Sequence, residues 1–227
     1  MRLIDALALL GSMDDPVFET ADAAVRLSLS NAHASATLAR LAAAHHLIRL
    51  RRGLWALPGR VDPLTLPARL TAPLPSYVSL QSALYFHGMI SQVPAVTYAV
   101  SLARARRFST PLGVISVHHV APSFFYGYED TGRTGVLMAS PEKALVDFLY
   151  LGPARSQLFR ALPELELPRG FKVSLARAII ARIPSRRRRA MVARAFEREL
   201  LSARRPGPAP RGSRGSRSRA ALSGPRR

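Results

Sequence analysis

The amino-acid sequence predicts an α+β fold built from two units. Residues 27–58 begin with small polar residues, continue as an alanine-rich helical pattern and end in two short apolar and basic runs on either side of Gly53. That order is typical of a helix followed by a β-hairpin. From residue 77 onward, β-rich runs alternate with helical patterns. We therefore expect an N-terminal winged helix-turn-helix followed by a mixed α/β C-terminal domain with a small sheet and packed helices.

Composition narrows the class of protein. Hydrophobic residues make up 48% of the 227 residues, which is enough to form a core in one or two domains. Cysteine is absent, which excludes disulfides and thiolate metal sites. No apolar run reaches the roughly 18 residues that a membrane span needs. An aspartate inside the first apolar run argues against a signal peptide. We expect a cytoplasmic protein with no membrane partner.

The charge of the chain is strongly positive and unevenly spread. The formal net charge is +19, and from residue 186 onward 14 arginines face only Glu197 and Glu199. This balance favours polyanionic partners, with nucleic acid first. The alternative is a GC-rich coding bias combined with a solvated tail. For the run at 186–189 the same two interpretations stay open: a second DNA contact or a solvated end.

Three helices and a hairpin are expected in the N-terminal unit. Leu3, Leu7 and Leu10 recur at helical spacing, which predicts a first helix over residues 1–12. A short extended piece at 17–19 precedes a second helix at 21–27, for which Thr20 or Asp22 is the expected N-cap. The third helix follows, capped by Ser30 or Asn31. The wing strands are expected at 47–51 and 54–57, joined by a turn at 52–53.

The third helix has one apolar face and one polar face. Ala34, Leu38 and Leu41 fall on the side that must be core, whereas short polar residues fall on an adjacent side. Such side chains can approach base edges in the major groove, and arginines on a wing can reach the phosphate backbone or the minor groove. We predict the following DNA contacts: Ser30, Asn31, His33, Thr37 and Arg40 on the helix, and Arg49, Arg51 and Arg52 on the wing. The alternative is a helical hairpin and β-ribbon without a DNA role.

The amino-acid composition changes after the wing. Four prolines punctuate the next stretch, which we interpret as a linker. Domain bounds are expected at 1–60 for the winged helix-turn-helix, 61–76 for the Pro-rich linker, 77–201 for the C-terminal domain and 202–227 for a disordered Arg-rich tail. Within the C-terminal domain we expect strands at 97–102, 113–120 and 136–139, with a basic turn at 104–111. We also expect a helix capped by Ser79 and ended by Gly88, and a second helix that begins at Ser140 and Pro141. Two more helices are expected at 175–183 and 186–200.

Three motifs of the C-terminal domain resemble those of a known family. The sequence reads YVSLQSALYFHGMISQVP from Tyr77, FFYGYED from Phe124 and ASPEKALVDFLYL from Ala139, and RRGLWALP precedes them. In this order they resemble the AbiEi family, the antitoxin and transcriptional regulator components of bacterial abortive-infection toxin–antitoxin systems. The likeness covers about residues 1–200 and leaves the Arg-rich tail unmatched.

The resemblance implies a two-domain repressor and antitoxin. The N-terminal winged helix would bind double-stranded DNA at repeats in its own promoter, and the C-terminal domain would counter a nucleotidyltransferase-like toxin without requiring a stable complex. It implies neither enzymatic activity nor a cofactor. Some relatives are solitary regulators without a toxin neighbour, so a domain that senses a ligand or another protein is the alternative. The antitoxin-domain motif residues, whose roles are unassigned, are Tyr77, Ser79, Ser82, His87, Gly88, Pro141, Glu142, Lys143 and Asp147.

Metal and hydrolase chemistry fit these residues less well. The two pairs of adjacent histidines, 45–46 and 118–119, diverge on a helix or strand, so we predict no metal site. A metal-dependent nuclease would need carboxylates that converge on an ion. Glu142 is more simply a first-turn acid and Lys143 its solvated neighbour. His87 is expected as a core or hydrogen-bonded side chain, and no nucleophile elbow accompanies it.

Overall fold

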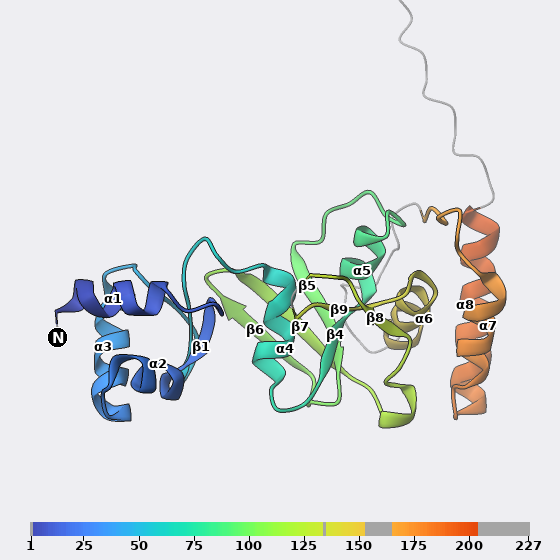
Figure 1. Ribbon diagram of the computed structural model, residues 1–227. Helices are drawn as coiled ribbons and strands as arrows, with labels where there is room; N and C mark the ends of the chain where they lie inside the picture. The colour runs from blue at the N-terminus through green and yellow to red at the C-terminus, as the bar shows by residue number, and fades with distance from the viewer. Residues whose placement is uncertain (1, 134, 153–164, 204–227) are drawn as a thin grey trace, which may run out of the picture.

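The computed structural model describes residues 2–133, 135–152 and 165–203 and shows a mixed α and β protein with two sheets (Figure 1). The α+β class predicted from the sequence is confirmed. The N-terminal unit comprises α1 (Leu3–Gly11), β1 (Val17–Glu19), α2 (Thr20–Leu27), α3 (Asn31–Ala43), β2 (Ile48–Arg51) and β3 (Leu54–Ala56). Its three strands are antiparallel in the order β1-β3-β2.

Helices α1, α2 and α3 cover one face of this small sheet. Leu10, Leu38, Leu41 and Trp55 are buried in their shared core. Helix α2 begins at Thr20, and Glu19 is its N-cap. The Asp22 carboxylate accepts the Glu19 backbone N–H at 2.8 Å. The prediction of Thr20 or Asp22 as the N-cap was therefore wrong.

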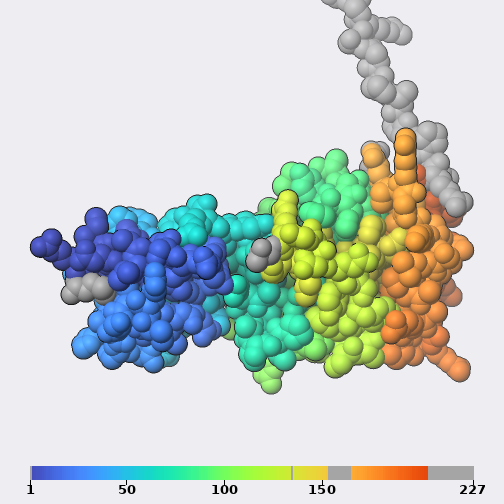
Figure 2. All heavy atoms as spheres, in the orientation of Figure 1, coloured from blue at the N-terminus to red at the C-terminus, as the bar shows by residue number. Residues whose placement is uncertain are grey.

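The other face of the small sheet is also covered. Val17, Leu50 and Leu54 pack in one hydrophobic cluster with Ile115 and Val117 of the second sheet. The N-terminal sheet is thus buried between its own helices and the rest of the chain. Figure 2 shows the resulting elongated outline, with the N-terminal unit at one end and α7 and α8 at the other.

The segment at 61–76, expected as a Pro-rich linker, contains ordered structure. It holds a 3-10 turn, η1 (Pro63–Thr65), followed by α4 (Leu66–Thr71), and the first residue of β4. Leu66 and Leu70 of α4 are buried in the cluster that joins the two sheets. Arg69 of α4 forms an ion pair with Asp15, which fixes α4 against the entry to β1. Prolines at the start of these turns are compatible with helix because their missing N–H groups have no helical partner there.

The second sheet has six strands in the order β6-β7-β5-β4-β9-β8. They are β4 (Ser76–Val78), β5 (Val96–Ser101), β6 (Arg106–Thr110), β7 (Gly113–His119), β8 (Tyr128–Asp130) and β9 (Leu137–Ala139), with a 3-10 turn η2 (Pro122–Phe124). Strands β5 and β7 are parallel, as are β4 and β9, and the other pairs are antiparallel. The expected strands at 97–102, 113–120 and 136–139 are confirmed. The basic turn expected at 104–111 was wrong, because most of it forms the edge strand β6.

Among the residues that the structure describes, four helices complete the C-terminal part: α5 (Leu80–Phe86), α6 (Pro141–Leu151), α7 (Val173–Ala181) and α8 (Arg186–Ala203). Helix α6 contacts α5, α7 and α8 and is buried on nearly every side. Within the described ranges, no helix has both the length and the apolar character needed to cross a bilayer. The tail was expected to be disordered from residue 202, but Ser202 and Ala203 belong to α8. The rest of the tail, residues 204–227, lies outside the described residues.

Candidate functional site

Helix α3 presents a polar surface to solvent. Ser30 is its N-cap, and the Ser30 hydroxyl accepts the His33 N–H at 3.3 Å, which fixes the first turn. Ala34, Leu38 and Leu41 are buried, as predicted. The predicted readers Asn31, His33 and Arg40 are exposed, and Thr37 is half-buried. All five predicted contacts of α3 therefore lie outside its core face.

The hairpin β2–β3 is fixed to the helices at its turn. The Thr20 backbone N–H donates to the Gly53 carbonyl at 2.9 Å, and the Trp55 indole N–H donates to the Thr20 hydroxyl at 2.9 Å. Gly53 has φ +79°, a left-handed conformation that glycine adopts without strain. These contacts hold the hairpin beside the start of α2, in the same unit as α3.

The three hairpin arginines have different surroundings. The guanidinium of Arg49 lies over the Trp55 ring, 5.5 Å from its centroid. Arg51 forms an ion pair with Glu19 at 3.5 Å, so its charge is partly compensated. Arg52 is exposed at the turn. Because α3 itself contains no Asp or Glu, the surface formed by α3 and this hairpin carries a positive balance.

The C-terminal motifs converge on a buried carboxylate. Asp147 of α6 is fully buried, and its Oδ2 atom accepts the Tyr77 hydroxyl at 3.0 Å and the Ser79 hydroxyl at 2.8 Å. Tyr77 also stacks on Tyr128 with ring centroids 4.7 Å apart. Burial raises the pKa of Asp147, and burial beside this carboxylate raises the pKa of Tyr77.

Lys143 completes this network, and its expected position in solvent was wrong. The side chain is 0% exposed, forms an ion pair with Asp147 and donates to the Phe124 carbonyl at 3.1 Å. Its ammonium lies 3.8 Å from the centroid of the Phe124 ring and 5.1 Å from that of Tyr126. Burial lowers the pKa of Lys143, whereas the Asp147 charge opposes that shift. A cation over aromatic faces is stabilised when it is withdrawn from water.

Three residues around Lys143 carried no individual prediction from the sequence. Phe124 and Tyr126 supply ring faces to its ammonium. Gly127 has φ +77°, and a Cβ atom there would lie 3.2 Å from the Lys143 Cγ atom. The aromatic run at 124–128 interrupted by glycine was the available signal, but only the fold places it over Lys143. Tyr77, Lys143 and Asp147 are buried, and their contacts hold β4 against α6.

The other motif residues make separate structural contacts. The Ser82 hydroxyl accepts the Tyr98 N–H at 2.9 Å, and Gly88 ends α5 with φ +68°. The His87 Nε2 atom lies 2.8 Å from the Ala139 carbonyl oxygen, so the expected hydrogen-bonded histidine is confirmed. These contacts link α5 to β5 and β9.

Glu142 and Pro141 begin α6. Pro141 occupies the first helical position, and the Ser140 hydroxyl accepts the Lys143 N–H at 3.2 Å, as the sequence predicted. Glu142 lies in the first turn but is buried, and its carboxylate accepts the Lys172 N–H at 2.7 Å. Glu142 therefore ties α6 to the entry of α7, a long-range contact that its position in the sequence did not indicate.

A pocket of about 450 Å³ lies beside these residues. His87, Glu129, Asp130, Pro141 and Glu142 are among its lining. Across the described ranges, no group of three or more His, Asp or Glu side chains is placed to hold a metal ion. Glu142 and Asp147 do not converge, because one bonds the Lys172 N–H and the other the Lys143 ammonium.

Comparison with known proteins adds no family to this geometry. No protein-family model matches the chain, and no curated protein matches it.

Proposed function

We propose that this protein is a DNA-binding transcriptional regulator whose N-terminal unit is a winged helix. Helix α3 enters the major groove of double-stranded DNA, and the hairpin β2–β3 contacts the flanking backbone. One observation carries the proposal: α3 has an exposed polar face without acidic residues, and the basic hairpin lies in the same N-terminal unit. The order helix, strand, two helices and hairpin supports a winged helix.

The residue types on α3 suit the groove. Ala32, Ser35 and Ala39 are small and exposed, so the helix backbone can approach the bases closely. Asn31 lies in the first turn, the part of a recognition helix that contacts base edges. An asparagine can pair with the edge of adenine and an arginine with that of guanine, each contributing about 1–3 kcal/mol of discrimination. Asn31 and Arg40 are therefore the readers with the greatest expected effect on sequence preference.

The hairpin arginines are assigned to phosphates. Arg49 and Arg52 are exposed, and contacts of arginine with phosphate add affinity without sequence information. Arg51 contributes less, because its ion pair with Glu19 has to yield before it can reach a phosphate. We expect the affinity of Arg51→Ala for DNA to fall less than that of Arg52→Ala.

Fluorescence anisotropy with two duplexes tests this proposal. One duplex carries repeats from the promoter upstream of the gene, and the other has the same composition in shuffled order. Asn31→Ala and Arg40→Ala should each reduce the ratio of the two affinities by about 5- to 150-fold, the equivalent of 1–3 kcal/mol. Arg169→Ala is the matched control, because Arg169 is exposed and lies outside α3 and the hairpin. A wild-type protein that binds both duplexes equally at moderate salt refutes the proposal.

A second role rests on the C-terminal motifs. Their resemblance to the AbiEi family favours an antitoxin that represses its own operon and counters a nucleotidyltransferase-like toxin. Co-expression with the adjacent gene tests this: growth arrest by that gene alone, relieved by this protein, is expected. Relief that survives Asn31→Ala would assign the antitoxin role to the C-terminal part. A harmless neighbour would remove the support for it.

The alternative is a solitary regulator that senses a ligand. The pocket lined by His87, Glu129 and Glu142 is the observation that favours it. His87→Ala and Glu129→Gln would then change the response of promoter binding to cell extract while leaving binding by the purified protein unaltered.

A further inference from the structure

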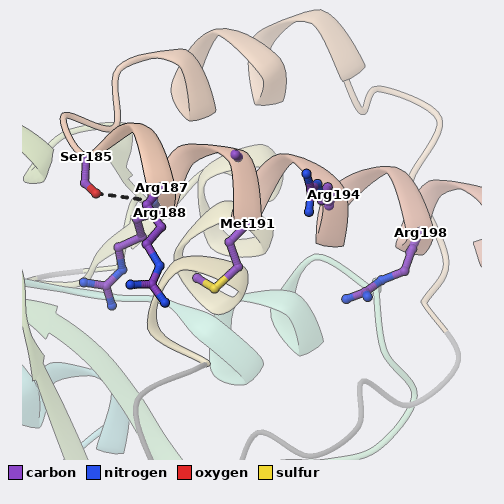
Figure 3. Close-up of a pocket in the computed structure, with 7 residues that line it drawn as sticks. Ser185, Arg187, Arg188, Met191, Arg194 and Arg198 are labelled. Carbon is purple, nitrogen blue, oxygen red and sulfur yellow. Dashed lines mark hydrogen bonds between the residues drawn. The ribbon is translucent and has the colours of Figure 1, made fainter.

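Helix α8 has two faces of opposite character. Val192, Phe196 and Leu200 are buried against the rest of the C-terminal part. The other side lines an open groove of about 770 Å³ (Figure 3). The residues that line it are Ser185, Arg187, Arg188, Ala190, Met191, Arg194 and Arg198. Their spacing of three and four residues places them along one side of the helix.

The described residues of this groove carry positive charge. Its described lining contains four arginines and no carboxylate. Helix α8 contains Glu197 and Glu199, and neither lines the groove. Glu197 is engaged by Arg177 of α7 through bonds of 3.1 and 3.2 Å. Arg187, Arg194 and Arg198 form no ion pair with the residues that the structure describes. Like charges held close together in this way attract a polyanion.

One arginine of the groove is held in place. The Arg188 guanidinium lies over the Tyr150 ring, 4.2 Å from its centroid, and donates to the Tyr150 carbonyl at 3.1 Å. Figure 3 shows Arg187 and Arg188 side by side at one end of the groove and Arg198 at the other. Arg198 follows Arg187 by eleven positions, a rise of about 16 Å along the helix. This row of cations is about as long as five phosphates of one DNA strand, which are spaced about 3.4 Å along the axis.

We propose that the arginine face of α8 binds the phosphate backbone of nucleic acid without sequence preference, as a second site separate from α3. The planar guanidinium forks match phosphate oxygens. The sequence beyond α8 adds eight arginines and no Asp or Glu over residues 204–227. This charge suits an extended polyanion better than the limited acidic patch of a protein partner.

The position of α8 makes this site independent of the first. Figure 1 shows α3 and α8 at opposite ends of the row of elements. The second site can engage a distant or bent part of the same nucleic acid, or a separate molecule. This inference does not rest on the regulator proposal, because it concerns sequence-independent affinity.

The test compares two charge-matched triple variants of the full chain. One carries Arg187→Ala, Arg194→Ala and Arg198→Ala. The control carries the substitutions Arg104→Ala, Arg107→Ala and Arg169→Ala, which remove the same charge from other exposed positions. Binding to a shuffled-sequence duplex is measured by anisotropy over a series of salt concentrations. The α8 variant should lower the slope of log affinity against log salt by about 2–3, since each lost phosphate contact removes about 0.9.

The outcomes separate this site from the first. The α8 variant should keep the wild-type ratio of promoter to shuffled affinity, whereas Asn31→Ala should change that ratio and leave the slope intact. An unchanged slope, or an equal loss in the control, overturns the inference. The inference is also overturned if the α8 variant loses binding to poly-glutamate but keeps its binding to duplex. That result would assign the arginine face of α8 to an acidic protein partner. Circular dichroism of both variants checks that α8 stays folded.

Discussion

Replacing Asp147 with asparagine would test whether the buried network clamps the fold. The substitution keeps the shape of the side chain but leaves the Lys143 ammonium, which is 0% exposed, without an anionic partner. The Tyr77 and Ser79 hydroxyls can still donate to the amide oxygen, so the loss comes mainly from the ion pair. Removing one partner of a buried pair costs about 3–5 kcal/mol. That is a large share of the roughly 5–15 kcal/mol that stabilises a typical domain.

Urea denaturation followed by circular dichroism at pH 7 measures the effect. Asp147→Asn should lower the free energy of unfolding by about 3–5 kcal/mol with an unchanged m-value. The mirror substitution Lys143→Met should cost a similar amount, because it strands the carboxylate. Glu129→Gln is the control, since this exposed carboxylate should change stability by less than about 0.5 kcal/mol.

The double variant Lys143→Met with Asp147→Asn shows whether the loss of stability comes from the ion pair or from packing. If the charges depend on each other, the double variant is more stable than the sum of the single effects predicts, by at least about 2 kcal/mol. Additive effects, or an Asp147→Asn variant within about 1 kcal/mol of wild type, would refute the reasoning. The network would then be held by packing alone.

Three further predictions follow from contacts elsewhere. Gly127→Ala should cost about 1–3 kcal/mol more than Gly59→Ala in urea denaturation, because both have positive φ but only the Cβ at 127 would press on Lys143. Burial lowers the pKa of His118 in the folded protein, so the unfolded state binds a proton at a higher pH than the folded state does. The free energy of unfolding should therefore fall as the pH drops below about 6.5, and His118→Gln should make it less dependent on pH in that range. Leu66→Ala should cost about 2–5 kcal/mol and shift the whole melting transition, whereas a separate early transition would contradict the shared cluster.

Much of the N-terminal unit could be predicted from the sequence, because its signals are local. The apolar spacing of Ala34, Leu38 and Leu41 sets the buried side of α3, and Gly53 marks the hairpin turn. The expected linker was wrong because four prolines at 61–76 suggested an extended segment, although two of them, Pro63 and Pro67, occupy first-turn positions of η1 and α4. There the burial of Leu66 against a distant strand decides the structure.

The C-terminal site shows the limit of local reasoning. Lys143 follows an acid at the start of a helix, a position that is usually solvated. Its burial depends on Asp147 one turn later, on Phe124 from another segment and on a glycine that leaves room for its stem. Strand β4 was missed for the same reason, since three residues between prolines and a helix carry no periodic signal, yet they lie at the centre of the sheet.

The small N-terminal sheet is covered on both faces, so the N-terminal unit is not expected to behave well when it is produced by itself. Its outer face meets Ile115 and Val117, which follow it far along the chain. A truncated protein that ends after β3 would leave Val17, Leu50 and Leu54 facing water, and an exposed apolar strip of this kind favours self-association. The same cut would uncover the matching apolar surface of the second sheet. Both parts are therefore expected to be more soluble, and to melt at a higher temperature, when they are joined in one chain.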